Sequence, residues 1–178
     1  MVTLWRSRYA KIVSGWNICN SLLPVMAGLS SSKKVSIDEW GLCYAVPGGI
    51  KTPHNMIHYP NLRKERYENE FGGTHTQWVY GDGRNKTYIY GGKVVENIVQ
   101  HLAREVLADL LLEFKRAIKA HYMPALLVHD EGVYVVKEEH AEGVLKMLND
   151  IFLQGVDWWP ALVTAGEAAI GDNYGEAH

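Results

Sequence analysis

The sequence has 178 residues, of which 47% are hydrophobic and 21% charged, and this composition is typical of one globular domain with a buried core. No segment is long and apolar enough to span a membrane, and no signal-peptide pattern opens the sequence. The net charge of −2 conceals an asymmetry, because residues 1–93 carry 12 Lys and Arg against 6 Asp and Glu, whereas residues 94–178 carry 6 against 14. A basic first half suits a polyanionic partner and an acidic second half suits metal or solvent, but this signal alone is weak.

The two cysteines, Cys19 and Cys43, lack the spacing of a metal site and are too few for a disulfide framework. We therefore expect a protein of a reducing cytoplasm, which would be that of the host cell if the protein is viral, and no contact with a membrane.

The first predicted element is an amphipathic helix. Apolar residues from Leu4 to Trp16 recur at near-helical spacing, with basic residues between them. We expect this helix to cover Val2–Leu23 and to stop at Pro24, because proline cannot continue a helix that has already begun.

The next part of the chain is predicted to be loop and strand. Small polar residues indicate a loop over Ala27–Lys34, and Ile37–Val46 is strand-like. The basic segment Lys51–Arg66 is expected to be irregular. The aromatic and β-branched runs Thr76–Tyr80 and Thr87–Tyr90 flank turn residues and predict a β-hairpin.

A long helix follows, because apolar residues recur every three or four positions from Val94 to Ile118. On another face of this helix, Asn97, Gln100 and Arg104 lie one above the next. Their amide and guanidinium groups can donate to the acceptors of the DNA minor groove. The alternative is a solvated helix face, which the periodicity alone does not exclude.

Two short apolar runs, Leu126–Val128 and Val133–Val136, flank His129, Asp130 and Glu131. This pattern predicts a hairpin with buried strands and three polar residues at its tip. Two carboxylates beside an imidazole are costly to desolvate without a nearby cation, and Mg²⁺ is the obvious candidate because it prefers carboxylate oxygens. On these three residues alone, a charged surface turn is the favoured interpretation.

The last elements are a helix over Ala141–Phe152 with Gly155 just beyond its end, a short strand Ala161–Ala165, and a polar, flexible tail Gly171–His178. The order of these elements predicts an α+β fold, in which helices cover an antiparallel sheet.

Several blocks of the sequence resemble family A DNA polymerases, the family of bacterial DNA polymerase I and many phage replicases. The His129-Asp130-Glu131 hairpin resembles motif C of this family. Three more matches occur in the right order, and the resemblance covers nearly the whole chain. Residues 4–16 resemble the helix after the fingers. Residues 59–63, followed by 90–100, resemble the segment before motif C in phage members. Residues 171–178 are similar to the family's carboxyl terminus.

The resemblance implies roles for individual residues. Asp130 matches the motif C aspartate that coordinates two catalytic Mg²⁺ ions, Glu131 the secondary acid beside it, and His129 the histidine near the primer's 3′ end. Gln100 matches a glutamine that contacts the primer-template duplex. We expect further DNA contacts from the neighbouring and matching positions Asn97, Arg104, Lys93 and Arg63.

The same resemblance implies that parts are missing. We find no motif A aspartate and no fingers helix with its nucleotide-binding Lys and Tyr. Tyr90-Gly91 does not match the fingers tyrosine, because its helix comes after it and the basic residue lies at the wrong distance. We therefore expect a C-terminal polymerase region that begins just past the fingers, with residues 1–26 as the following helix and residues 27–178 as a partial palm. Two Mg²⁺ ions, dNTP and primer-template DNA would then be shared with a partner chain that carries motif A and the fingers.

Three hypotheses follow from the sequence. The first is the C-terminal subunit of a split DNA polymerase, inactive alone. The second is a non-catalytic nucleic-acid-binding remnant of a polymerase gene, and the third is a small metal-binding domain unrelated to replication. The intact Asp130 favours the first over the second, and the four ordered matches disfavour the third.

Overall fold

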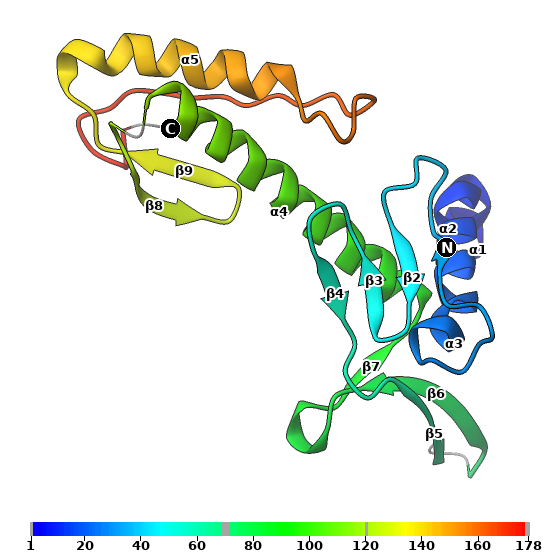
Figure 1. Ribbon diagram of the computed structural model, residues 1–178. Coiled ribbons are helices and arrows are strands. Elements are labelled where there is room, and N and C mark those ends of the chain that lie inside the picture. Colours follow the sequence, from blue (N-terminus) through cyan, green and yellow to red (C-terminus); the bar gives the residue numbers. More distant parts are fainter. Residues whose placement is uncertain (1, 69–71, 120, 177–178) are drawn as a thin grey trace. The chain divides into compact units, whose positions relative to one another are not determined.

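A computed structural model describes residues 2–68, 72–119 and 121–176 (Figure 1). The chain forms two compact units, Met1–Leu102 and Ala103–His178, and each is described separately below. Both combine helices with antiparallel β-strands, which confirms the predicted α+β class. In the described part of the chain, no helix is both long and apolar enough to cross a membrane.

The first unit begins with three helices where the sequence predicted one: α1 (Val2–Arg8), α2 (Ala10–Ser21) and α3 (Leu23–Met26). The prediction that Pro24 stops the helix was wrong, since Pro24 lies in the first turn of α3. Proline is tolerated there because a first-turn N–H has no partner within the helix. The remaining residues of α3 are buried and anchor this end of the unit.

A four-stranded antiparallel meander follows α3. Its strands are β1 (Val35–Ser36), β2 (Tyr44–Val46), β3 (Gly49–Lys51) and β4 (Met56–His58), in this order. The predicted strand over Ile37–Val46 was therefore mostly wrong. The carboxylate of Asp38 accepts hydrogen bonds from the backbone N–H groups of Trp40, Leu42 and Cys43, and these bonds close the chain into a turn.

A second antiparallel sheet contains β5 (Arg63–Glu68), β6 (Thr74–Tyr80) and β7 (Thr87–Ile89). The predicted hairpin is confirmed in the pair of β6 and β7, which a loop with a short 3₁₀ helix connects. The expectation that residues 51–66 are irregular was wrong. This segment contains the last residue of β3, the whole of β4 and the first part of β5.

The long helix α4 (Gly91–Ala117) confirms the strongest helical prediction. Residues 91–102 belong to the first unit and residues 103–117 to the second. Its first turn lies tightly against α2: a methyl group on Gly91 would overlap the carbonyl oxygen of Trp16, and the Gly91 N–H donates to Asn20 Oδ1 at 3.3 Å. Glycine is therefore required by a close backbone approach at this position.

The second unit contains the rest of α4, the hairpin of β8 (Pro124–Val128) and β9 (Glu131–Tyr134), and α5 (Ala141–Gln154). Its core consists of buried residues from α4, α5 and the segment after α5. They are Leu110, Phe114, Ile151 and Val156. Gly155, with φ +74°, follows α5 directly, as the sequence predicted.

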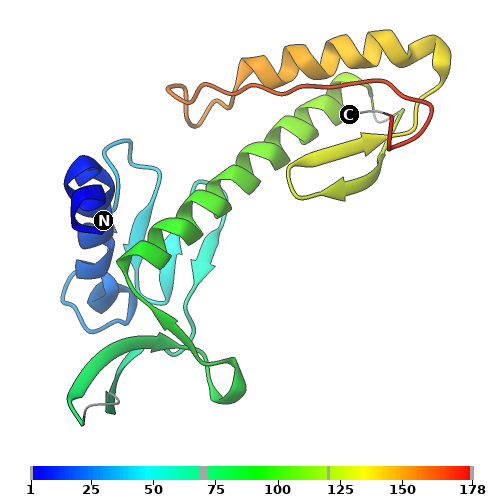
Figure 2. The ribbon, with the colours of Figure 1, turned by 180° about the vertical axis from the view of Figure 1, so that it is seen from behind.

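The predicted strand Ala161–Ala165 was wrong, because this segment begins with a turn and continues without strand pairing among the described residues. The Leu162 N–H donates to the Trp159 carbonyl at 3.0 Å, and Thr164 Oγ1 donates to the Phe152 carbonyl at 2.6 Å. The C-terminal segment thus runs back along α5, an arrangement that both views show (Figures 1 and 2).

Candidate active site on the β8–β9 hairpin

The hairpin of β8 and β9 presents the predicted site residues at its tip. Val128 pairs with Glu131, so His129 and Asp130 form a two-residue turn. His129 has φ +52°, in the left-handed region that such turns use and that histidine enters more readily than most residues. The side chains of His129, Asp130 and Glu131 are all exposed. The structure therefore brings these three predicted residues together.

The predicted burial of the hairpin strands was wrong for much of β8. Leu126 is 48% exposed and Leu127 58%, and Val135, just after β9, is 75% exposed. Among the described residues, β8 and β9 pair with each other and with no third strand. A continuous apolar run such as Leu126–Val128 is the pattern expected of a strand that is buried on both faces. The sequence pattern therefore could not distinguish a buried strand from an apolar strand at the surface.

The hairpin is held against α4 by its second strand. Tyr134 packs edge-on against the buried Phe114, with ring centroids 4.9 Å apart, and burial raises the pKa of Tyr134. Gly132 lies beside Leu111: an added Cβ there would be 3.3 Å from Leu111 Cδ2, closer than ordinary packing. Glycine directly after the acidic pair therefore allows β9 to lie close to the helix.

The C-terminal segment contributes a contact that sequence reasoning missed. The Tyr174 hydroxyl donates to Glu131 Oε2 at 2.7 Å, across 43 positions of sequence. The hydrogen bond to this carboxylate is the main cause that raises the pKa of Tyr174. The expectation of a flexible tail therefore does not describe Tyr174, and residues 177 and 178 lie outside the described part. A tyrosine in a polar tail carries no local signal of such a partner.

The residues at the tip fit a hard divalent cation only in part. Asp130 is an exposed carboxylate on a two-residue turn, the type of oxygen ligand that Mg²⁺ takes. One Glu131 oxygen is engaged by Tyr174. The described residues contain no group of three or more His, Cys, Asp or Glu side chains that could hold a metal ion. Any Mg²⁺ at Asp130 would therefore need further ligands from water, substrate or another chain.

Three of the predicted DNA contacts are engaged within the first unit. The Asn97 side-chain amide donates to the hydroxyl of the buried Tyr59 at 3.0 Å. Arg63 pairs with Glu65 at 2.6 Å, and Lys93 with Glu96 at 2.8 Å. These contacts give each residue a role in the fold, while a role in DNA binding stays a prediction.

The other two predicted DNA contacts, Gln100 and Arg104, have exposed side chains on α4. Gln100 lies in the first unit and Arg104 in the second. The predicted row of three polar groups thus includes one that faces Tyr59 and two that face solvent. Among the described residues, no hydrogen bond or ion pair engages these two exposed side chains, so their donors can contact a duplex.

Other aspartates of the chain have structural partners. Asp109 accepts from the indole N–H of Trp158 at 2.6 Å, and Asp38 closes the turn before β2. Asp82 accepts from the Asn61 amide at the loop between β6 and β7. These contacts account for three of the acidic residues without assigning them to a metal.

Comparison with known proteins gives one informative similarity. The chain is 27% identical over 184 residues to a DNA polymerase of Bacillus phage SP02, and the match covers 98% of this chain and 26% of that polymerase. No family model matches the chain, and no solved structure matches it. The chain is therefore distantly related to a phage DNA polymerase and spans about a quarter of that protein's length.

Proposed function

We propose that this chain is the C-terminal region of a family A DNA-directed DNA polymerase and is active only with a partner chain. One observation carries the proposal. In a chain that matches a phage DNA polymerase along 98% of its length, a two-residue turn presents His129 and Asp130, with Glu131 beside them. This is the arrangement that the resemblance to motif C implies.

Asp130 is the residue that would hold Mg²⁺, because its carboxylate is exposed at the tip and its oxygens are ligands of the type that Mg²⁺ prefers. Glu131 would play a secondary part, with one oxygen turned to Tyr174 and the other oriented by that contact. His129, next to Asp130 on the turn, would lie near the primer's 3′ end. When bound, two Mg²⁺ ions would activate the 3′-hydroxyl and stabilise the leaving pyrophosphate of dNTP.

A partner chain is part of the proposal because the described residues offer too few ligands for a complete metal site. The partner would supply the motif A aspartate and the fingers. The match covers 26% of the relative, and the proposal assigns the polymerase parts outside this match to the partner.

The surface of the hairpin supports association with such a partner. The β8–β9 sheet has two strands, and each therefore has an outer edge with no neighbouring strand among the described residues. Exposed apolar side chains, Leu126 and Leu127 among them, lie on the same hairpin. An added strand would supply backbone hydrogen bonds and cover apolar surface. We expect a large, apolar interface of the kind found in obligate complexes.

DNA binding in this proposal rests on Gln100 and Arg104, the exposed donors of α4, and on Arg63, Lys93 and Asn97 where their intrachain contacts allow it. Amide and guanidinium donors can bind minor-groove acceptors of primer-template DNA without reading a particular sequence. Such contacts suit an enzyme that must accept every base pair.

The test is primer extension by the complex captured from the cells that express a tagged chain, with Asp130→Asn compared with wild type. We expect the variant to capture the same partner and to lose at least about 100-fold in synthesis rate, because the charge that would hold Mg²⁺ is removed. Asp150→Asn is the matched control, since Asp150 is exposed on α5. Its complex should extend primers at the wild-type rate.

Two results would contradict the proposal. If the Asp130→Asn complex keeps the wild-type rate, the hairpin tip is structural. If the wild-type capture contains no polymerase-like partner and extends no primer, the chain is the non-catalytic, nucleic-acid-binding remnant instead.

A further inference from the structure

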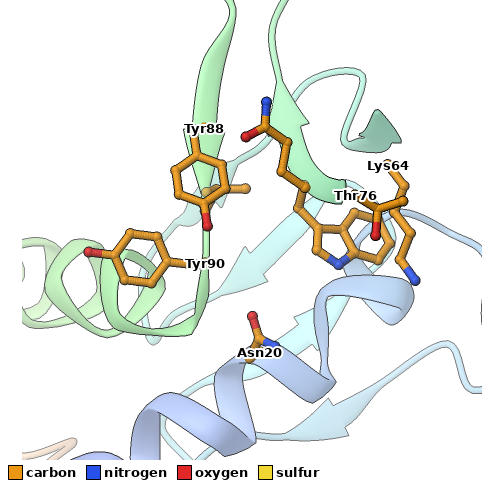
Figure 3. Close-up of a pocket in the computed structure, with 8 residues that line it drawn as sticks. Asn20, Lys64, Thr76, Tyr88 and Tyr90 are labelled. Carbon is orange, nitrogen blue, oxygen red and sulfur yellow. The ribbon is translucent and has the colours of Figure 1, made fainter. Parts of the chain in front are cut away.

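The first unit contains a hollow, whereas the hairpin of the proposed active site belongs to the second unit. The volume of the hollow is about 260 Å³, and it is bounded by the β5–β6–β7 sheet, α2 and the residue before α4. This is close to the lower limit of about 300 Å³ for ligand pockets, so the hollow has room for one small planar group. The lining residues are Asn20, Lys64, Thr76, Gln77, Trp78, Tyr88, Ile89 and Tyr90 (Figure 3).

Two tyrosines give the hollow an exposed aromatic wall. Tyr88 is 51% exposed and Tyr90 47%, and their rings are stacked with centroids 5.5 Å apart and an interplanar angle of 27°. Among the described residues, neither hydroxyl has a hydrogen-bond partner. These rings therefore contribute little to the core, and their exposed faces are available to a planar ligand.

A basic strand lies beside this wall. The register places Lys64 opposite Trp78 and Arg66 opposite Thr76, so both cations share a face of the sheet with two lining residues. The Lys64 ammonium lies 5.1 Å from the Trp78 ring centroid. Neither Lys64 nor Arg66 has an ion pair within the described ranges. Glu65 lies between these two cations on the other face of β5, where it pairs with Arg63 and Lys86, and Glu68 shares the face of Lys64 and Arg66 at the far end of the strand, opposite Thr74.

We propose that this hollow binds one unpaired nucleobase of a DNA single strand, with the adjacent phosphates at Lys64 and Arg66. Base stacking on aromatic side chains and cations along the backbone are the two elements by which proteins bind single strands without reading sequence. A base within a duplex is already stacked on its neighbours and cannot enter a hollow of this size. The site is separate from Asp130 and does not depend on the proposed catalytic activity.

The test is fluorescence anisotropy of a labelled oligo(dT) 12-mer titrated with the full chain. We expect Tyr88→Ala to weaken binding about 5- to 100-fold, because one stacked base is lost, while Tyr88→Phe binds like wild type. Lys64→Ala should lower the slope of log affinity against log salt by about 0.7, the share of one phosphate contact on a single strand. Tyr67→Ala is the matched control, because Tyr67 is an exposed tyrosine of the same sheet that does not line the hollow.

Circular dichroism of each variant establishes that it is folded before its affinity is compared. Two competitors identify the ligand: a duplex of the same sequence, which we expect to compete poorly, and thymidine monophosphate, which should compete only at far higher concentration than the strand. The proposal is wrong if the wild-type chain does not bind the oligonucleotide, if Tyr88→Ala and Tyr67→Ala bind alike, or if duplex or free nucleotide competes as well as the single strand.

Discussion

The tight contact between α2 and α4 makes the stability effect of one substitution predictable in sign. In Gly91→Ala, the new methyl group would overlap the Trp16 carbonyl oxygen and lie 2.8 Å from the Asn20 backbone nitrogen. Both are backbone atoms, which cannot rotate away as a flexible side chain can. The two helices must therefore separate, and this displaces the start of α4 that carries Asn97 and Gln100.

The magnitude follows from two opposing terms. Overpacking of this kind costs about 1–3 kcal/mol. Alanine in place of glycine in a helix returns about 0.5–1 kcal/mol. Gly91 is the first residue of α4, where alanine returns at most about 0.5 kcal/mol of this, so we expect Gly91→Ala to lower the free energy of unfolding by about 0.5–3 kcal/mol and the Tm to fall by about 1–12 °C.

Gly15→Ala provides the control with the opposite sign. Gly15 lies inside α2, and a Cβ there would meet no heavy atom within 4 Å. Only the helix-propensity term remains, so this variant should be more stable than wild type by about 0.5–1 kcal/mol. Urea and thermal unfolding followed by circular dichroism measure both changes. A Gly91→Ala protein as stable as wild type would refute the close backbone contact.

Other predictions concern single hydrogen bonds and one titration. Asn97→Ala leaves the buried Tyr59 hydroxyl without its donor and should lower the free energy of unfolding by about 1–3 kcal/mol. Gln100→Ala changes an exposed side chain, so it should change this free energy by less than about 0.5 kcal/mol and weaken primer-template use by the complex. Equal urea midpoints for the two variants would contradict this prediction. Burial raises the pKa of Tyr59 to about 12 from an ordinary value of 10.0. The unfolded chain therefore loses this proton first, and the stability that Tyr59 contributes is complete below about pH 10 and is lost as the pH rises to about 12. Urea unfolding across this window should show a smaller pH dependence for Tyr59→Phe, and an identical dependence would exclude Tyr59 as its source. Tyr174→Phe removes the donor to Glu131, so amides of the C-terminal segment should exchange hydrogen faster while the Tm changes little; unchanged exchange would show that this bond does not hold the segment.

Elements with long, regular patterns could be predicted from the sequence. The apolar stripe of α4 extends over many turns, and α5 is bounded by Gly155, so both helices were correctly placed. The hairpin around His129 and Asp130 was also predicted, because polar residues interrupt two apolar runs there, but the structure places Glu131 in β9 and leaves a turn of two residues.

Short elements and long-range contacts could not be predicted. Strands of two or three residues, such as β1 and β2, are too short to show an alternating pattern. The Asp38 turn replaced an expected strand because one carboxylate binds three backbone N–H groups, which periodicity does not register. Asn97 has a tertiary partner 38 positions away and Tyr174 one 43 positions away, and no local pattern marks either.

The most direct test of the central claim is to separate the two chains of the captured wild-type complex and assay primer extension by each chain alone and by the recombined mixture, with Mg²⁺ and all four dNTPs. The account predicts no template-directed synthesis by this chain alone, because its described residues offer no complete metal site, and none by the partner alone, because the partner lacks Asp130. The mixture should recover synthesis with wild-type chain and not with Asp130→Asn. Robust extension by this chain alone, or by the partner alone at the rate of the mixture, would contradict the account.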